Sequence, residues 1–389
     1  MKNNWLECRN VLIIRPDNLG DLIMSAPAIR AVKETLNCKI TILTSSMAAG
    51  VAGLIPEIDE VLMYDLPWVK NERVPDSNQF FEVIAELKKR EFDGAILFTV
   101  FSQNPLPAAM LAYLAGIPLR LAYCRENPYH LLSDWIPEKE PYSFIRHQVK
   151  RDLELVASIG LTTTNDQLSL VVSDDNRSSA IEKLSDVGVN LDKPWLILHA
   201  GVSELKRQYP QQRWIDTGRR IQKELEYQIL LTGTLSEKEL TDQLAKGIGS
   251  NAFSLAGLLS LKEFISLIKM APVVVSVNTG TIHIAAAVGT PVVVLYAQTN
   301  PQHTPWKVPH RVLPFEVPED LRSKNEVLQY VHQLIYDNVV PMPEPEEVIK
   351  HIRLLIAVPT LEPSFASPTL SEPILVGSLF YERSYQNGF

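Results

Sequence analysis

Residues Val11–Lys33 read VLIIRPDNLGDLIMSAPAIRAVK, and this stretch decides the fold class of the chain. Its β-branched start, Val11–Arg15, predicts a buried strand, and the apolar periodicity from Asp21 to about Leu36 predicts a helix. A polar turn that contains Gly20 joins the two. A strand, a short turn and a helix in this order are typical of parallel β–α–β units, whose strands are covered by helices.

The same alternation continues along the first half and restarts in the second half, after the polar stretch Ser173–Ser179. It predicts two α/β domains, each with a parallel sheet and helices on both faces. The further strands that we expect are Lys39–Thr44, Val61–Tyr64, Gly94–Phe98, Trp195–His199, Gln228–Leu231, Val273–Val277 and Val292–Tyr296. The further helices are Phe80–Arg90, Trp214–Lys223, Ser236–Ile248 and Leu261–Met270.

The domain boundaries follow from this pattern and from changes in composition. We expect an N-terminal Rossmann-like domain over 1–175 and a C-terminal Rossmann-like domain over 176–315. A helical extension follows over 316–357, with helices near 324–336 and 345–357. Residues 358–389 are rich in Pro and Ser, which predicts a loose tail.

The composition narrows the class of protein. The chain has 389 residues, of which 46% are hydrophobic and 21% charged, which is enough for two packed domains. It has no signal-like start and no apolar run near the roughly 18 residues that span a bilayer, so we expect a cytoplasmic protein. Three cysteines without a CxxC pair fit a reducing compartment. The net charge of −8 argues against a general nucleic-acid binder.

The first candidate site is the turn from Arg15 to Asp21. Functional loops of parallel sheets follow the carboxyl ends of the strands, which is where this turn lies. At a helix start, Asp21 is expected first of all as a capping or first-turn acid. In the functional interpretation, its carboxylate faces the interdomain cleft and acts as a general base that accepts a proton from an attacking hydroxyl.

The second and third candidates follow the first two strands of the second half. In His199–Ser203, Gly201 allows close approach of a ligand, and Lys206 and Arg207 are cations suited to a diphosphate. A solvated basic turn explains the same cations. In the stretch from Thr232 and Gly233 to Glu237, we expect Ser236 to cap a helix together with Glu239. Glu237 is an alternative ligand for ribose hydroxyls.

The fourth candidate, Ser276–Pro291, is the most informative. A buried strand ends at Asn278, a polar turn with Thr279 and Gly280 follows, and a helix of small residues begins. The side chains and free amides of this helix start form an anion site. His283 lies one turn into the helix, where a histidine on its own is more often a core residue.

Several common motifs are missing from the sequence. It contains no GxGxxG after either first strand, which argues against a nicotinamide-dependent dehydrogenase, and no GxxxxGK[ST] loop. It also contains no Asp-x-Asp pair, so a metal-bridged diphosphate would lack its usual carboxylates.

The order of these motifs resembles glycosyltransferase family 9, the ADP-heptose:lipopolysaccharide heptosyltransferases. The resemblance runs from about Val11 to Trp306 and includes VLIIRPDNLGDLIMSAPAIRAVK, ILHAG, LLTGTLSEKEL, SLAGLLSLKEF and NTGTIHIAAAVGTPVVVLYAQTNP. It implies a GT-B fold, in which two Rossmann-like domains face each other across a cleft. The acceptor then binds in the first domain and the nucleotide sugar in the second.

The resemblance also implies an inverting transfer that needs no metal or other cofactor, from an ADP-linked heptose or related sugar. The acceptor would be a hydroxyl of a lipopolysaccharide core or another envelope glycan, reached from the inner face of the plasma membrane. Asp21 falls on the catalytic aspartate of the family. The donor-binding residues that we expect are Ser203, Lys206, Arg207, Thr232, Gly233, Glu237, Asn278, Thr279, Gly280 and His283.

The chain departs from the family pattern at two positions. The family has Lys three residues before a Pro, whereas this chain has Arg207 at that distance from Pro210 and Lys206 one place earlier. The family has Asp where this chain has Asn278, which removes a carboxylate from the donor site. This second departure supports one alternative, a binding protein with impaired catalysis. A nucleotide-sugar epimerase with the same two-domain fold is another.

A basic stretch late in the first half offers a possible acceptor contact. Arg146, His147, Lys150 and Arg151 would attract an acidic glycolipid. A solvated face of a helix is the more common explanation of such a run.

Overall fold

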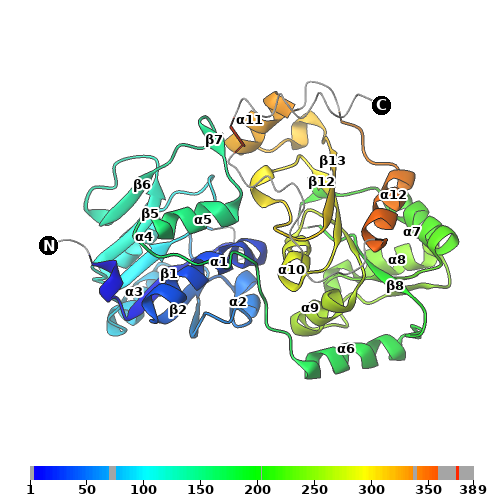
Figure 1. Ribbon diagram of the computed structural model, residues 1–389, viewed down its shortest axis with the longest axis horizontal. Coiled ribbons are helices and arrows are strands. Elements are labelled where there is room, and N and C mark those ends of the chain that lie inside the picture. The colour runs from blue at the N-terminus through cyan, green and yellow to red at the C-terminus, as the bar shows by residue number, and fades with distance from the viewer. Residues whose placement is uncertain (1–3, 70–75, 203, 336–339, 358–373, 376–389) are drawn as a thin grey trace.

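The computed structural model describes residues 4–69, 76–202, 204–335, 340–357 and 374–375. Figure 1 shows two α/β halves side by side, each built around its own sheet. Both sheets are six-stranded and parallel, as the alternation of strands and helices predicts.

The first sheet has the strand order β3-β2-β1-β4-β5-β6. Side chains alternate between its two faces, so Val11 and Ile13 of β1 pack with helices α1, α2 and α5, whereas Leu12 and Ile14 pack with α3 and α4. The strands are β1 (Asn10–Ile14), β2 (Lys39–Thr44), β3 (Glu60–Met63), β4 (Gly94–Leu97), β5 (Leu119–Cys124) and β6 (Asp134–Pro137). The helices are α1 (Leu19–Leu36), α2 (Ser46–Ala52), α3 (Ser77–Lys89), α4 (Leu106–Leu114) and α5 (Gln148–Ala157), with short turns η1 (Trp5–Glu7) and η2 (Tyr129–Leu131).

The second sheet repeats this order as β10-β9-β8-β11-β12-β13. Helices α6, α9 and α10 cover one face, and α7, α8 and α12 cover the other. The strands are β8 (Trp195–His199), β9 (Gln228–Leu231), β10 (Ala252–Ser254), β11 (Val274–Val277), β12 (Val292–Ala297) and β13 (His310–Phe315). The helices are α6 (Asp174–Asp186), α7 (Gln211–Leu225), α8 (Lys238–Ile248), α9 (Leu261–Met270), α10 (Gly280–Val288) and α12 (Pro345–Ile356), with turns η3 (Leu205–Arg207), η4 (Leu235–Glu237), η5 (Pro301–His303) and η6 (Glu319–Leu321).

Every strand expected from the sequence is present, but strands β5, β6, β10 and β13 of the two large sheets were not predicted. Strand β13 contains Pro314, and β6 ends at Pro137. Proline is accepted on edge strands because its missing N–H is not needed for pairing. The polar stretch Ser173–Ser179 at the domain junction forms the first turns of helix α6. Ser173 is the N-cap of this helix, and its Oγ accepts a hydrogen bond from the Asn176 amide at 3.3 Å.

The C-terminal extension contacts both halves. Helix α11 (Glu326–Ile335) places Val327 and Val331 against Phe101 and Ile145 of the first half, whereas α12 packs on α7 of the second. Most of the tail predicted over 358–389 lies outside the described residues. The described pair, Ile374–Leu375, forms strand β14, which runs antiparallel to β7 (Phe144–Ile145) of the first half.

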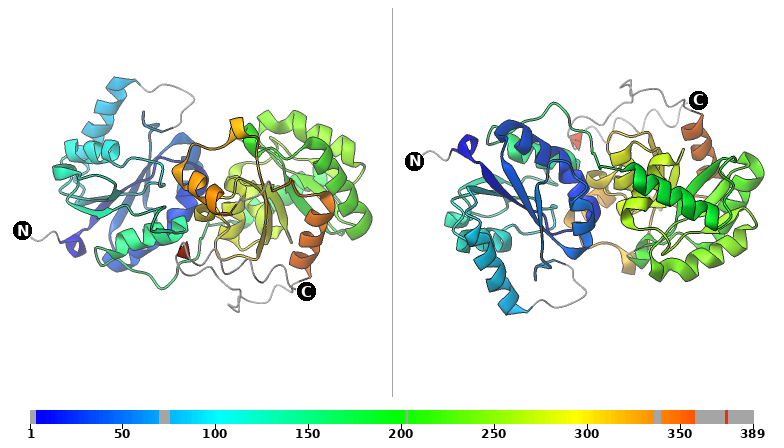
Figure 2. Two further views of the ribbon diagram at one scale, coloured as in Figure 1. Left: turned by 90° about the horizontal axis from the view of Figure 1, so that it is seen from above. Right: turned by 90° about the horizontal axis from the view of Figure 1, so that it is seen from below.

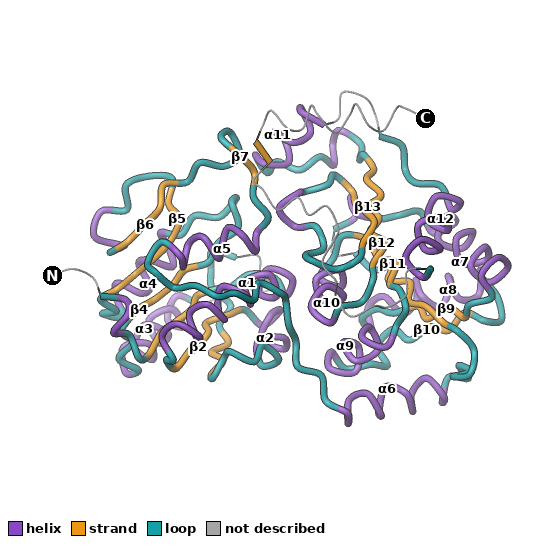
Figure 3. The backbone as a smooth tube through the Cα atoms, in the orientation of Figure 1, coloured by secondary structure: helices purple, strands orange, loops and turns teal. Residues whose placement is uncertain are grey.

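The loop between α5 and α6 carries the chain from one half to the other (Figure 3). Arg30 of α1, which is buried, holds this loop by donating from Nη1 to the carbonyls of Asn165 (2.9 Å) and Gln167 (2.7 Å). The same guanidinium pairs with Glu57 at 2.6 Å. Charge-assisted bonds from a buried guanidinium are stronger than neutral ones, so this side chain fixes the junction.

Replacing Arg30 with Met should therefore lower the free energy of unfolding by about 2–4 kcal/mol, because two carbonyls and Glu57 lose their partner. Urea unfolding followed by circular dichroism measures the change. The matched control is Arg219→Met, which removes one exposed hydrogen bond to the Gly247 carbonyl. Equal losses in the two variants would show that the Arg30 contacts do not stabilise the junction.

Candidate functional site

The predicted site residues lie at corresponding places in the two sheets. The strand order reverses between β1 and β4 in the first sheet and between β8 and β11 in the second. In open parallel sheets, ligands bind beyond the carboxyl ends of the strands at such reversals. The turn with Asp21 follows β1, the turn with Lys206 and Arg207 follows β8, and the turn with Asn278 follows β11.

The blue helix α1 and the yellow helix α10 pack against each other where the two halves meet (Figure 2), and Gly20 and Gly280 near their N-termini lie at this contact. Glycines allow this approach, because a Cβ on Gly20 would lie 2.7 Å from Cδ2 of His283. A Cβ on Gly280 would lie 3.1 Å from the side chain of Leu19. The halves are therefore in contact at this point, and the buried apolar cluster that includes Ile23 and Ile282 continues from one half into the other.

Asp21 stands in the first turn of α1 beside this contact, with an exposed fraction of 9%. Its Oδ2 accepts weakly from the backbone N–H (3.4 Å) and side-chain amide (3.3 Å) of Asn18, so the expected capping role is present. Burial alone would raise the pKa of Asp21, but Arg15, His303 and His283 together hold it below its ordinary value. The carboxylate is therefore ionised at neutral pH and lies close to side chains of both halves.

A buried ionic cluster beneath Asp21 was not predicted from the sequence. Arg15 is fully buried, with Nε 3.2 Å from Asp17 Oδ2 and Nη2 3.9 Å from Asp21 Oδ1. Asp17 also accepts a hydrogen bond from Gln103, in the loop after β4, and burial raises its pKa to about 6. Asp152 of α5 accepts from Ser25 Oγ at 2.7 Å. Arg15 thus holds the turn and its acids together.

The two candidate cations of the second half lie in the short turn η3. Arg207 Nη1 donates to the backbone carbonyl of Asn278 at 3.1 Å and so joins the turns after β8 and β11. Both cations also pair with Glu204, at 2.7 Å from Lys206 Nζ and 3.2 Å from Arg207 Nη2. The structure therefore gives both cations an acidic partner, and only Arg207 is seen to contact the turn after β11.

The start of α10 presents polar groups to this same point. Thr279 is its N-cap residue, and the side-chain oxygen of Asn278 is buried without a hydrogen-bond partner among the described residues. His283 has an exposed fraction of 6%, and burial lowers its pKa to about 3. The free amides and the helix dipole make this end of α10 electropositive. The neutral imidazole of His283 adds no charge to it.

Glu237 takes part in a capping box with Thr234 at the turn η4, in the third candidate stretch. The expected capping by Ser236 and Glu239 is wrong: Thr234 precedes the turn η4, and its N–H donates to Glu237 Oε2 at 2.7 Å. The carboxylate lies directly over Gly201, where a Cβ would come within 2.0 Å of Oε1. The acid therefore covers the backbone of the turn after β8, next to the predicted ligand-binding glycine.

The other members of the predicted donor set differ in their surroundings. Thr232 is buried, and its hydroxyl lies 3.0 Å from Nδ1 of His199, a residue whose pKa is lowered by burial. Gly233 adjoins Glu237, since a Cβ there would lie 2.9 Å from Oε2. Ser203 lies outside the described residues.

Two histidines lie at the junction: His147, which the sequence placed in the basic stretch, and His303, which the sequence did not single out. His147 is the N-cap of α5, its Nε2 lies 2.8 Å from the Thr304 carbonyl, and its ring lies 4.6 Å from that of Trp306. His303 belongs to η5, directly after β12. The available signal was the position of TNPQHTPW at the end of a parallel strand, where functional loops occur.

The basic stretch in the first half is neither a solvated face nor an open acceptor site. Arg146 and Arg151 are buried and pair with Glu140, at 3.4 and 3.0 Å. Glu140 in turn accepts at 3.0 Å from Gln302 of the second half. These ion pairs therefore lie within the first half, and the hydrogen bond from Gln302 joins them to the second half.

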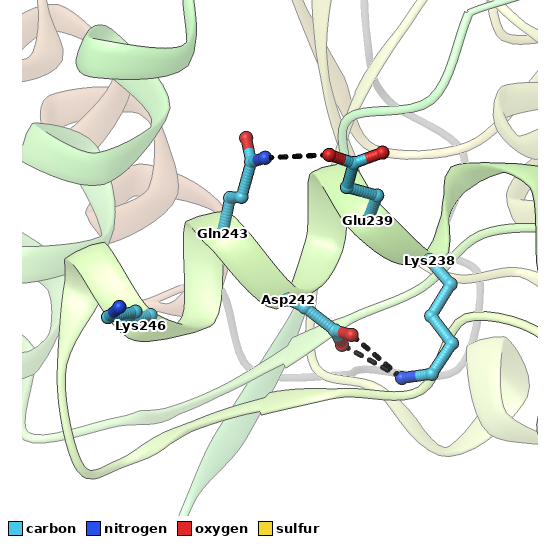
Figure 4. A pocket seen from close by; sticks show the side chains of 5 residues that line it. All are labelled: Lys238, Glu239, Asp242, Gln243 and Lys246. Carbon is cyan, nitrogen blue, oxygen red and sulfur yellow. Dashed lines mark hydrogen bonds and ion pairs between the residues drawn. The ribbon is translucent and has the colours of Figure 1, made fainter.

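A depression of about 460 Å³ lies on the outer surface of α8, away from this site (Figure 4). It is crossed by an ion pair of 2.9 Å between Lys238 and Asp242 and a hydrogen bond of 3.3 Å from Gln243 to Glu239. Because one exposed helix supplies all of its lining, it has the character of solvated surface. Within the described ranges, no group of three or more His, Cys, Asp or Glu side chains is placed to hold a metal ion. None of the described helices is both long and apolar enough to cross a bilayer.

Comparison with known proteins identifies relatives over most of the chain. The model of a family described as glycosyltransferase family 9 (heptosyltransferase) matches residues 80–323. Lipopolysaccharide heptosyltransferase 2 of Escherichia coli is 22% identical over 362 residues, which is 89% of this chain and 98% of the relative. Lipooligosaccharide heptosyltransferase 2 of Haemophilus influenzae is 23% identical over 76% of this chain and 85% of its own length.

Solved structures show the same fold. A family 9 glycosyl transferase from Veillonella parvula covers 92% of this chain and 98% of its own, with a TM-score of 0.75 and 18% identity. ADP-heptose LPS heptosyltransferase II of E. coli covers 89% of this chain and 98% of its own, with a TM-score of 0.67 and 20% identity. The family match begins at residue 80, after Asp21, so the assignment of Asp21 to the site depends on its position and contacts in the structure.

The contact between α1 and α10 leads to a first test of this site. Gly20→Ala should lower the free energy of unfolding by about 1–3 kcal/mol, because the added Cβ would lie 2.7 Å from the buried His283 ring. Thermal unfolding measures the effect. The control is Gly53→Ala, where nothing lies within 4 Å of the new Cβ. A Gly20→Ala protein as stable as the control would contradict direct packing of the two helix starts.

Proposed function

We propose that this chain, which belongs to glycosyltransferase family 9, the heptosyltransferase family, moves a heptose or related sugar from an ADP-linked donor to a glycan hydroxyl. The observation that carries the proposal is that Asp21 lies where α1 packs on the start of α10, directly after the turn whose Asn278 carbonyl accepts a hydrogen bond from Arg207. A carboxylate from one half then faces groups suited to a diphosphate from the other.

The donor class is supported by the relatives and by the chemistry of the second half. One structural relative is described as an ADP-heptose LPS heptosyltransferase, and a further E. coli heptosyltransferase structure, with a TM-score of 0.60, contains ADP-2-deoxy-2-fluoro heptose. In this chain, the amides at the start of α10 and the guanidinium of Arg207 would bind the phosphates. Thr232, Gly233 and Glu237 line the adjoining turn and would face the ribose. We keep Ser203, Lys206, Asn278, Thr279, Gly280 and His283 in the proposed donor-binding set.

The proposed reaction is a single displacement with inversion. Asp21 accepts the proton of the acceptor hydroxyl while that oxygen attacks the anomeric carbon of the donor sugar. The bond from the anomeric carbon to the β-phosphate oxygen breaks, and its electron pair leaves with ADP. A bound diphosphate would counteract the field of Arg15 on Asp21 and raise the pKa of that carboxyl, which makes it a better base when donor is present.

The leaving diphosphate gains charge as the bond breaks. Arg207, Lys206 and the first amides of α10 would stabilise that charge in the transition state, which is where stabilisation accelerates the reaction. We propose that these groups act without a metal or another cofactor. The absence of an Asp-x-Asp pair from the sequence supports this part of the proposal.

The acceptor is proposed from the names of the relatives. Because they are lipopolysaccharide and lipooligosaccharide heptosyltransferases, a core or envelope glycan is the acceptor that we propose. Such an acceptor would be met at the inner face of the plasma membrane, with the enzyme in the cytoplasm and the first half binding the glycan.

A catalytically impaired binding protein is the second candidate function, and Asn278 is the observation that favours it, since the resembling family has Asp there. Turnover separates the two functions. Purified protein with ADP-heptose and a lipopolysaccharide-core acceptor releases ADP if it is a transferase. ADP-heptose that binds but is never consumed would favour the binding protein, and epimerised donor without an acceptor would favour an epimerase.

The role of Asp21 is tested with Asp21→Asn, which keeps the shape of the side chain but removes the base. Transfer should fall by about 100-fold or more, the range attributed to a positioned general base. Calorimetry should show ADP-heptose binding within about threefold of wild type, because the phosphate-binding groups are unchanged. A fully active variant would reject Asp21 as the base.

The two cations are distinguished by Arg207→Ala and the matched variant Lys206→Ala. Because only Arg207 is bonded to the turn after β11, its loss should weaken ADP binding about tenfold, and the loss of Lys206 should weaken it less. Isothermal calorimetry with ADP gives both values. If Arg207→Ala binds ADP like wild type while Lys206→Ala does not, the phosphate role passes to Lys206.

A further inference from the structure

We infer that His303 contacts the transferred sugar of the donor, through a hydrogen bond between its Nε2 and a sugar hydroxyl. The inference rests on the proposed function, which it extends by one substrate-binding residue. It depends on the position of His303, on the charged groups that act on its ring and on the missing hydrogen-bond partner of its Nε2 within the described part of the chain.

The backbone of His303 is held in place by both halves of the molecule. It belongs to η5, whose N-cap Asn300 accepts from the Gln302 amide (3.0 Å) and from the His303 amide (3.0 Å). The Gln302 side chain donates at 3.0 Å to Glu140 of the first half. The imidazole therefore starts from a fixed point at the junction of the halves.

The charged groups that act on the imidazole are the residues of the proposed reaction. They are Asp21 and Arg15 of the first half and Arg207 of the second. The turn of Arg207 also packs beside β12, the strand that leads into His303. The ring is therefore within electrostatic reach of both the proposed base and the proposed phosphate cation. The group between base and phosphate in an inverting transfer is the donor sugar.

The chemistry of the ring fits a sugar hydroxyl. Burial lowers the pKa of His303, so the ring is neutral at pH 7 and has one donor and one acceptor nitrogen. Its Nε2 is buried and has no hydrogen-bond partner among the described residues. A histidine kept only for packing would leave this nitrogen unsatisfied, which costs about 1–3 kcal/mol. A hydroxyl, which both donates and accepts, matches either tautomer.

The position of His303 also separates it from the nucleotide. It follows β12, one strand further from β8 than the turn after β11, whereas Glu237 and Thr232, the proposed ribose contacts, follow β9 on the other side of β8. A contact from His303 should therefore act on the sugar and leave binding of the nucleoside diphosphate unchanged.

The test compares ADP with ADP-heptose by isothermal calorimetry on the full-length protein. We expect His303→Ala to weaken ADP-heptose binding about tenfold, the loss of one such hydrogen bond, and to change ADP binding less than about twofold. His303→Gln places an amide nitrogen near the position of Nε2 and should recover most of the affinity for ADP-heptose. His351→Ala on α12, remote from the junction, is the matched control and should bind both as wild type does.

Each outcome decides the matter. Equal weakening of ADP and ADP-heptose by His303→Ala, or no weakening of either, would overturn the sugar contact while leaving the proposed transfer intact. Failure of His303→Gln to recover binding, in a variant with wild-type thermal stability, would also overturn it. If wild-type protein does not bind ADP-heptose, the proposed donor fails, and the role of His303 fails with it.

Discussion

The packing of two helix N-termini against each other is the constraint on which the rest of this structure depends. The start of an α-helix carries partial positive charge and free amides, so two such ends repel unless negative charge lies near them. Asp21 supplies part of that charge from within the first turn of α1. Gly20 and Gly280 let the ends approach, since side chains there would strike His283 and Leu19. The fold thus brings unsatisfied electropositive ends to the place where an anionic donor is proposed to bind.

The buried ionic cluster explains how an acid is kept charged at such a closed contact. A carboxylate removed from water would bind a proton unless a nearby cation offsets the lost hydration. Arg15 provides that cation for Asp21 and for Asp17. Gln103 donates a hydrogen bond to Asp17, and Ser25 donates one to Asp152. Because Asp17 has its pKa raised and Asp21 has its pKa lowered, the cluster separates two neighbouring acids by environment. Burial raises the pKa of both acids. It outweighs the effect of Arg15 at Asp17, whereas at Asp21 the effect of Arg15 and the hydrogen bond from Asn18 contribute to a pKa below the ordinary value.

The sequence predicted the inner strands and the loops after β1, β8 and β11, because buried parallel strands are continuous apolar runs. It did not predict strands such as β13, in which Pro314 and the polar residues His310 and Arg311 weaken that signal. It also did not predict pairings between distant residues. Arg146 and Arg151 look solvated in the sequence, and only the fold brings Glu140 and Gln302 to them. The cap at Thr234 was missed because Thr234 and Ser236 both offer a hydroxyl, and Glu237 and Glu239 both offer an acid three residues further on. Local geometry decides between the two pairs.

Asn278 is better understood from its contacts than from its residue type alone. The guanidinium of Arg207 donates to the backbone carbonyl of Asn278, so a change of the Asn278 side chain leaves that guanidinium in position. An amide in place of a carboxylate removes one negative charge from the point where a diphosphate would meet α10. Since Glu204 and Glu237 already place carboxylates around the same turns, a third would oppose an anionic donor more strongly. The physical effect of the asparagine is therefore to favour anion binding, and loss of catalysis does not follow from it while Asp21 and Arg15 are retained.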